Sequence, residues 1–293
     1  MNEENQKSKE RLEILKKIDE YELEGKFDVD VEEDPPTIAL TEDVDYLNKK
    51  VTSKINTSIA NIAGKKFLKK IIKEKALIIK QISGIENLNN LESGAIITCN
   101  HFNPFDCFSI EYMFEKSNKS KSHKLYKVIR EGNYTNFPGF YGFLFKNCNT
   151  LPLSSSTNIM EKFLEATSQI LKDKNYILIY PEQSMWWNYK KPKPLKDGAF
   201  KIAVKNDVPV LPVFITMKES DIVGNDGFNI MEYYINIEKP IYKKDGISQK
   251  EAIKHMKKEN YATWKSVYES FYEIPLTYTT KKEILDKYSS IIG

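Results

Sequence analysis

The chain has 293 residues, of which 41% are hydrophobic and 29% charged, which suits one large domain with a sizeable core or one domain with an extension. No stretch approaches the roughly 18 apolar residues of a membrane-spanning helix, and we expect no secretory signal in the polar, acidic start. The net charge of +3 is uneven: residues 1–45 hold 16 Asp or Glu against 6 Lys or Arg, so the remainder is basic and predicts an anionic partner.

The first forty residues differ from the rest in charge and in apolar pattern. Residues 9–24 predict an amphipathic helix with Leu12, Leu15, Ile18 and Tyr21 on one stripe. The charged segment 28–37, with its paired prolines, then predicts a linker. We therefore expect residues 1–40 to be an acidic extension and linker, which either covers the site, binds a partner or does neither.

Residues 41–75 predict a basic amphipathic helical segment. Thr41 can cap a helix that Gly64 interrupts, and residues 65–75 then set four apolar side chains against six lysines. Such a helix can lie in a bilayer interface, attracted to anionic headgroups. It can equally be a solvated helix packed on its own core. The apolar positions are Val44, Leu47, Val51, Ile55, Ile59, Ile62, Phe67, Leu68, Ile71 and Ile72.

Residues 76–293 predict an α/β domain. Its apolar runs predict strands at 76–82, 93–99, near 150, 176–180, 208–215 and 231–242, and helices at 157–172, 198–206 and 248–272. This rhythm predicts a largely parallel or mixed central sheet flanked by helices, with an N-terminal helical extension. Chemistry in such sheets gathers at the carboxyl ends of the strands.

His101 follows one of these strand ends. Asn103 can cap a helix that has Pro104 at its first position, which puts Asp106 at the third, where a carboxylate stays ionised. The turn can fold His101 over Asp106, so that one ring nitrogen donates to the carboxylate and the other accepts a proton. With no serine or cysteine nucleophile evident beside it, the pair would deprotonate a substrate hydroxyl. The alternative is a capped turn whose histidine only satisfies local hydrogen bonds.

Glu182 follows the strand at 176–180 and should lie at the same edge of the sheet. It would then converge on the site, although a surface glutamate after a turn is the usual explanation of such a position. The cysteines, Cys99, Cys107 and Cys148, are odd in number and widely spaced, which fits packing residues in a reducing cytosol and predicts no metal site.

Five motifs in order, and one further segment at 84–88, resemble the lysophospholipid or 1-acyl-glycerol-3-phosphate acyltransferase family, the PlsC type. Its Asn-His-x-x-x-x-Asp signature is matched by Asn100, His101 and Asp106. Its third block, normally Phe-Pro-Glu-Gly-Thr-Arg-Ser, is similar to residues 180–186. The resemblance covers roughly residues 76–216, and the other similar segments are 84–88, 130–153, 195–200 and 208–213.

The resemblance implies transfer of an acyl group from acyl-CoA or acyl-carrier protein, as co-substrate, to an alcohol. His101 would take the hydroxyl proton and Asp106 would hold the imidazole and stabilise the imidazolium. No cofactor and no metal is implied. The residues expected to contact substrate are Asn100, Arg130, Glu182, Gln183, Ser184 and Lys196.

The chain departs from the family at two places where an arginine is normal. Met185 stands where the third block has its phosphate-binding arginine, and Ser154 and Ser155 stand at the end of the second. These changes are not conservative. Either the acceptor is different, such as a glycolipid, another lysolipid or an unphosphorylated alcohol, or other cations supply the charge. The candidates are Arg130, Lys190, Lys191, Lys193 and Lys196.

Two aromatic segments have open roles. Trp186, Trp187 and Tyr189 lie beside lysines and either sit at a membrane interface, wall the acceptor pocket or pack in the core. Residues 136–145 either touch an acyl chain or belong to the core.

The sequence thus predicts an O-acyltransferase of lipid metabolism and phospholipid biosynthesis, acting on a lysophospholipid, glycolipid or related lipid acceptor. We expect it in the cytoplasm, peripheral on the inner face of the cell membrane, with the anionic membrane surface as a partner. The alternatives are acylation of a soluble or sugar hydroxyl, or a catalytically silent lipid-binding scaffold. Nucleic acid is not expected as a partner, since no recognised binding motif is present.

Overall fold

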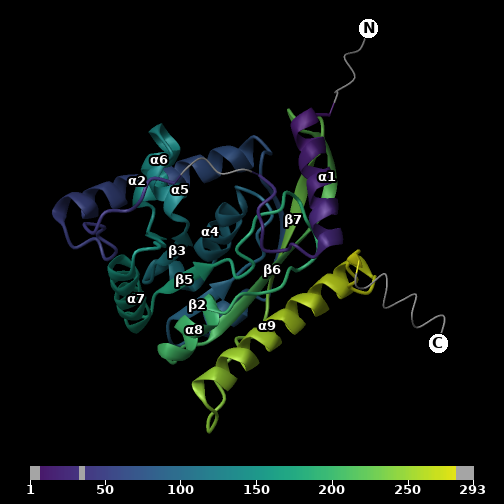
Figure 1. The fold of residues 1–293 in the computed structure, drawn as a ribbon. Helices are drawn as coiled ribbons and strands as arrows, with labels where there is room; N and C mark the ends of the chain where they lie inside the picture. Colours follow the sequence, from purple (N-terminus) through teal and green to yellow (C-terminus); the bar gives the residue numbers. More distant parts are fainter. Residues whose placement is uncertain (1–6, 33–36, 282–293) are drawn as a thin grey trace.

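The computed structural model describes residues 7–32 and 37–281. Over these residues, seven strands form one sheet in the order β1-β7-β6-β2-β5-β3-β4 (Figure 1), parallel throughout except where β6 meets β7. The strands are β1 (Ile78–Ser83), β2 (Ala95–Thr98), β3 (Leu125–Ile129), β4 (Thr150–Pro152), β5 (Tyr176–Ile179), β6 (Val210–Val223) and β7 (Asn229–Ile237). The helices are α1 (Lys9–Glu24), α2 (Val51–Lys73), α3 (Ile85–Asn89), α4 (Asp106–Lys116), α5 (Glu131–Thr135), α6 (Gly139–Asn147), α7 (Thr157–Lys172), α8 (Gly198–Lys205) and α9 (Gln249–Tyr272).

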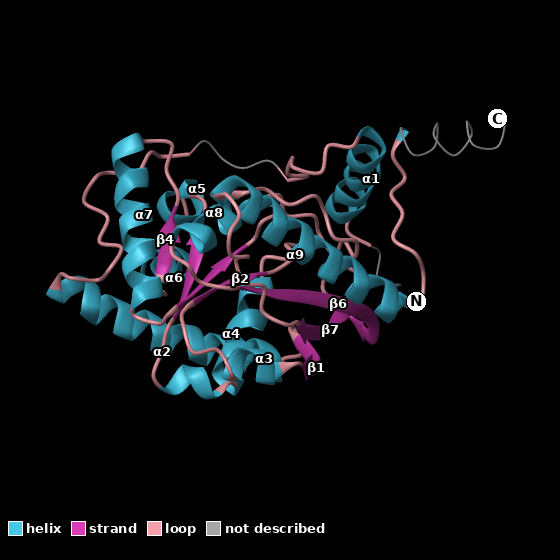
Figure 2. Ribbon diagram, turned by 90° about the horizontal axis from the view of Figure 1, so that it is seen from below, coloured by secondary structure: helices cyan, strands magenta, loops and turns pink. Residues whose placement is uncertain are grey.

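Helices cover both faces of the sheet and bury its central strands (Figure 2). One buried apolar cluster joins the sheet to α7, α8 and α9, and a second joins it to α2, α3 and α4. Strands β2 and β5 are buried along their whole length and largely apolar, as expected of parallel strands with helices on both sides. The predicted mixed sheet flanked by helices is confirmed.

The helix predicted from Thr41 begins ten residues later, at Val51, and so Thr41 is not its cap. The Asp45 carboxylate accepts hydrogen bonds from the N–H groups of Lys49 and Lys50. These bonds hold the chain in a turn just before the helix. The helix also runs without a break through Gly64 to Lys73. Its buried side chains are Thr57, Ala60, Leu68 and Ile71, and its exposed apolar side chains are Val51, Ile55, Ile59 and Ile62.

The N-terminal helix α1 forms over the predicted residues and packs on the body of the molecule, but Leu12 of the predicted apolar stripe is exposed. Its Ile14 and Ile18 contact a small buried cluster that includes Trp186, Trp187 and Val31. Part of the predicted linker, residues 33–36, lies outside the described residues. Residues 26–32 follow α1 without helix or strand and lie against the loop after β5. None of the helices in the described ranges is long and apolar enough to cross a membrane.

Candidate functional site

His101 and Asp106 meet at the carboxyl end of β2. His101 Nδ1 lies 2.6 Å from Asp106 Oδ2, and the same carboxylate oxygen accepts the Phe102 N–H at 3.2 Å. The Asn103 side chain accepts the Phe105 N–H at 2.9 Å, so the Asn-Pro pair forms a turn and α4 starts at Asp106 itself. Asp106 is therefore the first residue of the helix, not the third as predicted. It remains in the first helical turn, where its carboxylate lies near free amide groups.

Tyr180, just past β5, completes the surroundings of Asp106. Its hydroxyl donates to Asp106 Oδ1 at 2.7 Å, and its ring stacks on the His101 imidazole with centroids 4.2 Å apart. Burial raises the pKa of Tyr180 well above its usual value, and the charge of Asp106 adds to this, so the phenol remains a donor at neutral pH. These contacts hold Nδ1 and the plane of the ring, while the His101 side chain stays 24% exposed. Nε2 is thus the nitrogen left for a substrate.

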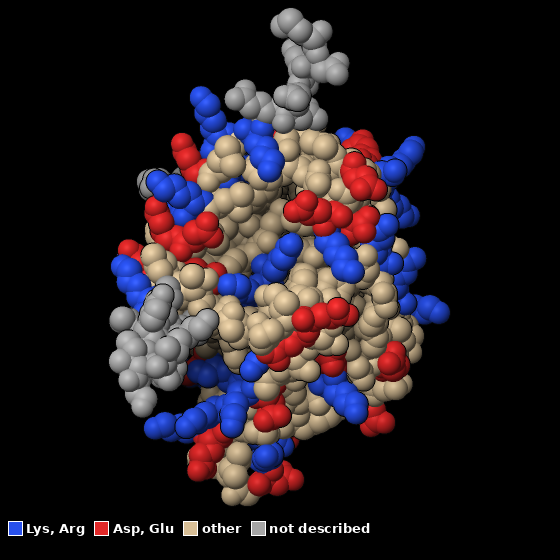
Figure 3. All heavy atoms as spheres, turned by 90° about the vertical axis from the view of Figure 1, so that its right-hand side faces the viewer, with Lys and Arg blue, Asp and Glu red and all other residues tan. Residues whose placement is uncertain are grey.

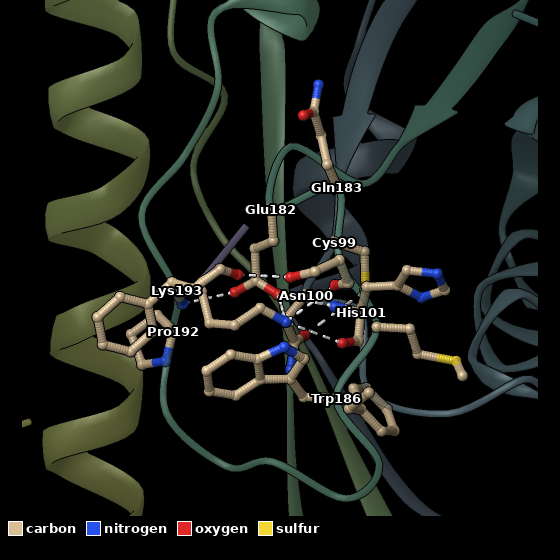
Figure 4. Close-up of polar contacts among 12 residues, drawn as sticks. Cys99, Asn100, His101, Glu182, Gln183, Trp186, Pro192 and Lys193 are labelled. Carbon is tan, nitrogen blue, oxygen red and sulfur yellow. Dashed lines mark hydrogen bonds and ion pairs between the residues drawn. The ribbon is translucent and has the colours of Figure 1, made fainter. Parts of the chain in front are cut away.

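Glu182 supports the backbone of this loop instead of contacting a substrate as predicted. Only 2% of the residue is exposed. One oxygen accepts the His101 N–H at 3.0 Å and the other accepts the Lys193 N–H at 2.7 Å. Figure 4 shows its carboxylate beside the Lys193 ammonium, 3.2 Å away, with the His101 ring turned away from both. Burial lowers the pKa of Lys193, and the charge of Glu182 opposes that shift.

The Asn100 side chain also bonds the protein backbone, instead of contacting a substrate as predicted. Its side-chain amide donates to the Ile215 carbonyl at 3.0 Å and accepts the Ile215 N–H at 2.8 Å. Both halves of the buried amide are therefore used in joining the end of β2 to β6.

Arg130, Gln183 and Ser184 gather beside this loop, and the N-terminal segment contacts Arg130 and Ser184. The Arg130 guanidinium donates to Asp30 and to the Gln183 carbonyl, the latter at 3.2 Å. The Ser184 hydroxyl is buried and donates to the Phe27 carbonyl at 2.6 Å, so it is not open to a substrate as predicted. Gln183 is exposed and has φ of 66°, the left-handed conformation that favours the glycine usual at this place in the family.

The lysines considered as replacements for the missing arginine are largely neutralised within the chain. Lys191 lies 2.6 Å from Glu22, and Lys196 lies 2.7 Å from Asp28, while Lys193 is buried with Glu182 as described above. Lys190 lies over the Tyr272 ring. Figure 3, which views the side that carries α1, shows positive and negative side chains interleaved over that face. Paired in this way, Lys191 and Lys196 are poor sites for an anionic headgroup.

The aromatic residues after β5 belong to the core, which decides between the three alternatives. Trp186 is fully buried, donates its indole N–H to the Val29 carbonyl at 2.8 Å and stacks on Phe27. Trp187 and Tyr189 pack in the same cluster against α1. They therefore neither face a membrane nor wall an open pocket.

The cysteines are free and are poor nucleophiles at neutral pH. Burial raises the pKa of the Cys107 thiol to about 12 and that of Cys148 to about 11, and it raises the pKa of Cys99 well above its usual value. Within residues 7–32 and 37–281, no group of three or more His, Cys, Asp or Glu side chains could hold a metal ion.

Two residues of the site were not predicted from the sequence. Tyr180 stood in the quoted third block, but nothing near it along the chain indicated a bond to Asp106. Asp30 lies in an acidic run with no local signal of its partners, Arg130 and the Met185 N–H, which are 100 and 155 residues away.

Comparison with known proteins agrees with this geometry. Residues 80–216 match the family model described as Acyltransferase. The fold is similar to that of the crystal structure of the 1-acyl-sn-glycerophosphate (LPA) acyltransferase PlsC from Thermotoga maritima. The TM-score is 0.51 at 20% identity, over 76% of this chain and 84% of that one. A search of curated proteins finds no match.

Proposed function

We propose that this chain, whose residues 80–216 match the Acyltransferase family model, moves a fatty acyl group from a thioester to a hydroxyl of a lipid-like acceptor. The donor is acyl-CoA or acyl-carrier protein, and the acceptor is a lysophospholipid, glycolipid or related molecule. The contact of 2.6 Å between His101 Nδ1 and Asp106, which leaves Nε2 for a proton, carries the proposal.

The reaction follows from that arrangement. Nε2 of His101 takes the proton of the acceptor hydroxyl as its oxygen bonds to the thioester carbonyl carbon. Asp106 stabilises the imidazolium that forms, and Tyr180 holds Asp106 through its hydroxyl. The tetrahedral intermediate then breaks its C–S bond, and the thiolate takes the proton back from the imidazolium. The products are an ester and a free thiol, and His101 is neutral again.

The surface over α2 and α6 supports a lipid substrate. Four apolar side chains of α2 are more than half exposed, and α6, which lies beside α2 (Figure 1), exposes Phe140 and Tyr141 at 45% and 47%. The second half of α2 adds exposed Lys65, Lys66 and Lys69. Apolar side chains next to lysines suit an anionic bilayer surface. We therefore propose that the protein binds the inner face of the cell membrane from the cytoplasm, with α2 and α6 in the interface.

The test is an acyl-transfer assay with the purified full chain. Radiolabelled acyl-CoA and acyl-carrier protein are each supplied with a panel of lysophospholipids, glycolipids, monoacylglycerols and sugars, and the products are separated. The proposal expects labelled ester on a lipid hydroxyl. Ester on sugars alone would move the assignment to a soluble acceptor. Vesicle binding with no transfer to any acceptor would instead identify a silent scaffold.

A further inference from the structure

We propose that Asp30 sets the acceptor class, so that the site takes a hydroxyl acceptor whose head group carries no phosphomonoester. The inference rests on the proposed acyl transfer and adds the specificity of that site.

Asp30 fills an anion site next to the catalytic histidine. One of its oxygens bonds the Arg130 guanidinium, and the other accepts the Met185 N–H at 2.8 Å. A guanidinium and a backbone amide converging on one anion are donors that would otherwise suit a phosphate. The site adjoins the backbone of His101, because the next amide along the chain, that of Trp186, donates to the His101 carbonyl at 3.4 Å.

The segment that carries Asp30 is built into the molecule and is not a loosely attached strap. Carbonyl groups on either side of Asp28 are bonded to the third block: Phe27 accepts from Ser184, and Val29 accepts from the Trp186 indole. Val31 is only 3% exposed and packs against the two tryptophans. Moving the segment would break these bonds and expose a fully buried Trp186, which is unfavourable. Asp30 is therefore held in a fixed position beside the third block.

A phosphomonoester meets an unfavourable charge beside Asp30. It brings a charge of roughly −1.5 to −2 at neutral pH, and Arg130 is already bonded to a carboxylate. The neighbouring Lys191 and Lys196 are paired with Glu22 and Asp28, so they do not offset this. An acceptor with an uncharged, hydroxyl-bearing head group encounters no such repulsion.

The experiment compares two acceptors that differ only in the phosphate, a lysophosphatidate and the monoacylglycerol with the same chain. Wild type is expected to use the monoacylglycerol with a kcat/KM at least tenfold higher. Asp30→Asn keeps an acceptor for the Met185 N–H but removes the charge opposite Arg130. It should raise the kcat/KM ratio of lysophosphatidate to monoacylglycerol about tenfold, the change expected from one charge-assisted contact. Adding Arg130→Ala should abolish that gain.

Glu32→Gln is the matched control, because Glu32 lies in the same segment but pairs with Arg11 at 3.1 Å. The kcat/KM ratio of lysophosphatidate to monoacylglycerol should be the same in this variant as in wild type. Calorimetry with glycerol 3-phosphate gives a readout that is independent of turnover: binding is expected with Asp30→Asn and not with wild type or the double variant. An unchanged acceptor ratio and no phosphate binding in Asp30→Asn, with transfer intact, would overturn the inference and leave the proposed function standing. Transfer to neither acceptor nor any other in the panel would overturn the proposed function.

Discussion

At the scale of single residues, Asp106 organises the site because donors from three directions meet on its carboxylate. The His101 ring and the Phe102 N–H reach one oxygen, and the Tyr180 hydroxyl reaches the other. A buried carboxylate with this many donors is held in place, and its contact with Nδ1 fixes which imidazole nitrogen carries the proton. In the proposed reaction Tyr180 acts through Asp106 and by stacking on His101, as a positioning residue.

Tyr180→Phe should lower kcat about five- to tenfold with little change in the acceptor KM. The variant removes one hydrogen bond to Asp106, worth on the order of 1 kcal/mol, but keeps the stacked ring and the fold. Steady-state kinetics with the best acceptor measure this effect.

Tyr46→Phe is the matched control, because Tyr46 is also buried and donates to the Pro152 carbonyl at 2.8 Å, away from the site. It should lower the melting temperature but leave kcat unchanged. Equal kcat values for Tyr180→Phe and wild type would contradict the positioning role.

The sequence could predict those parts of the site that are close along the chain. His101 and Asp106 are five residues apart around one turn, and the strand before them marks the sheet edge, so their meeting followed from local rules. Tyr180 and Asp30 reach their partners across 74 to 155 residues, and only the packed fold brings these together. Burial likewise decided the roles of Glu182 and Trp186, whose sequence context allowed a surface position.

At the scale of elements, α1 and the segment after it are held to the body by carboxylates. One of these carboxylates, that of Glu22, is buried. It accepts hydrogen bonds from the Lys191 ammonium, from the Tyr189 hydroxyl and, at 2.7 Å, from the Thr279 N–H. The acidic N-terminus, whose role the sequence left open, therefore covers the third block and joins it to residues near the C-terminal end of the described chain.

Glu22→Gln should reduce the free energy of unfolding at pH 7 by about 2 kcal/mol, because it removes the buried charge that Lys191 needs. Burial alone would raise the pKa of Glu22, but the donors from Lys191, Thr279 and Tyr189 bring it below its ordinary value. Its stabilising effect is thus fully present above the ordinary carboxyl pKa. It is lost as the pH falls through the lowered one.

The difference between wild type and Glu22→Gln should accordingly shrink as the pH is lowered from 7 towards 3. Urea denaturation followed by tryptophan fluorescence measures it, since Trp186 and Trp187 pack against α1. Glu13→Gln, on the exposed face of the same helix, should match wild type at each pH. A pH-independent difference would show that the charge of Glu22 is not what holds α1.

At the scale of the whole molecule, most of the fold followed from the alternation of strand and helix patterns, but the strand next to one edge of the sheet was missed. β3 lies between β5 and β4 and was not predicted, because Lys127 interrupts its apolar pattern. In the structure the Lys127 ammonium lies 2.7 Å from Glu111. The pairing is long-range, so the sequence pattern could not show it.

The two ends of the fold differ in surface chemistry: charged side chains of both signs interleave over α1 (Figure 3), whereas α2 and α6 expose apolar side chains.

Replacing Ile55 and Ile59 together with Asp should reduce binding to anionic vesicles by tenfold or more. Both side chains are about half exposed, at 54% and 52%, and each would bury apolar area in a bilayer, whereas Asp is repelled by anionic headgroups. Flotation with phosphatidylglycerol vesicles measures the binding, which should also weaken in high salt if the lysines contribute.

Val223→Asp with Ile247→Asp is the control pair, because these residues are exposed at 44% and 39% but lie outside α2 and α6. Vesicle binding should be unaffected. Binding that is lost equally in both pairs, or that persists in the α2 pair, would show that α2 is not the membrane surface.

The central claim is that His101, held by Asp106, removes the proton from an acceptor hydroxyl. The most direct measurement is kcat/KM for acyl transfer by wild type, His101→Ala and Asp106→Asn, each confirmed as folded by its thermal unfolding. Because Asp106→Asn cannot stabilise the imidazolium or hold the required tautomer, we expect its kcat/KM to fall about a thousandfold. The kcat/KM of His101→Ala should fall at least as much. Transfer within about tenfold of wild type in either folded variant would contradict the claim.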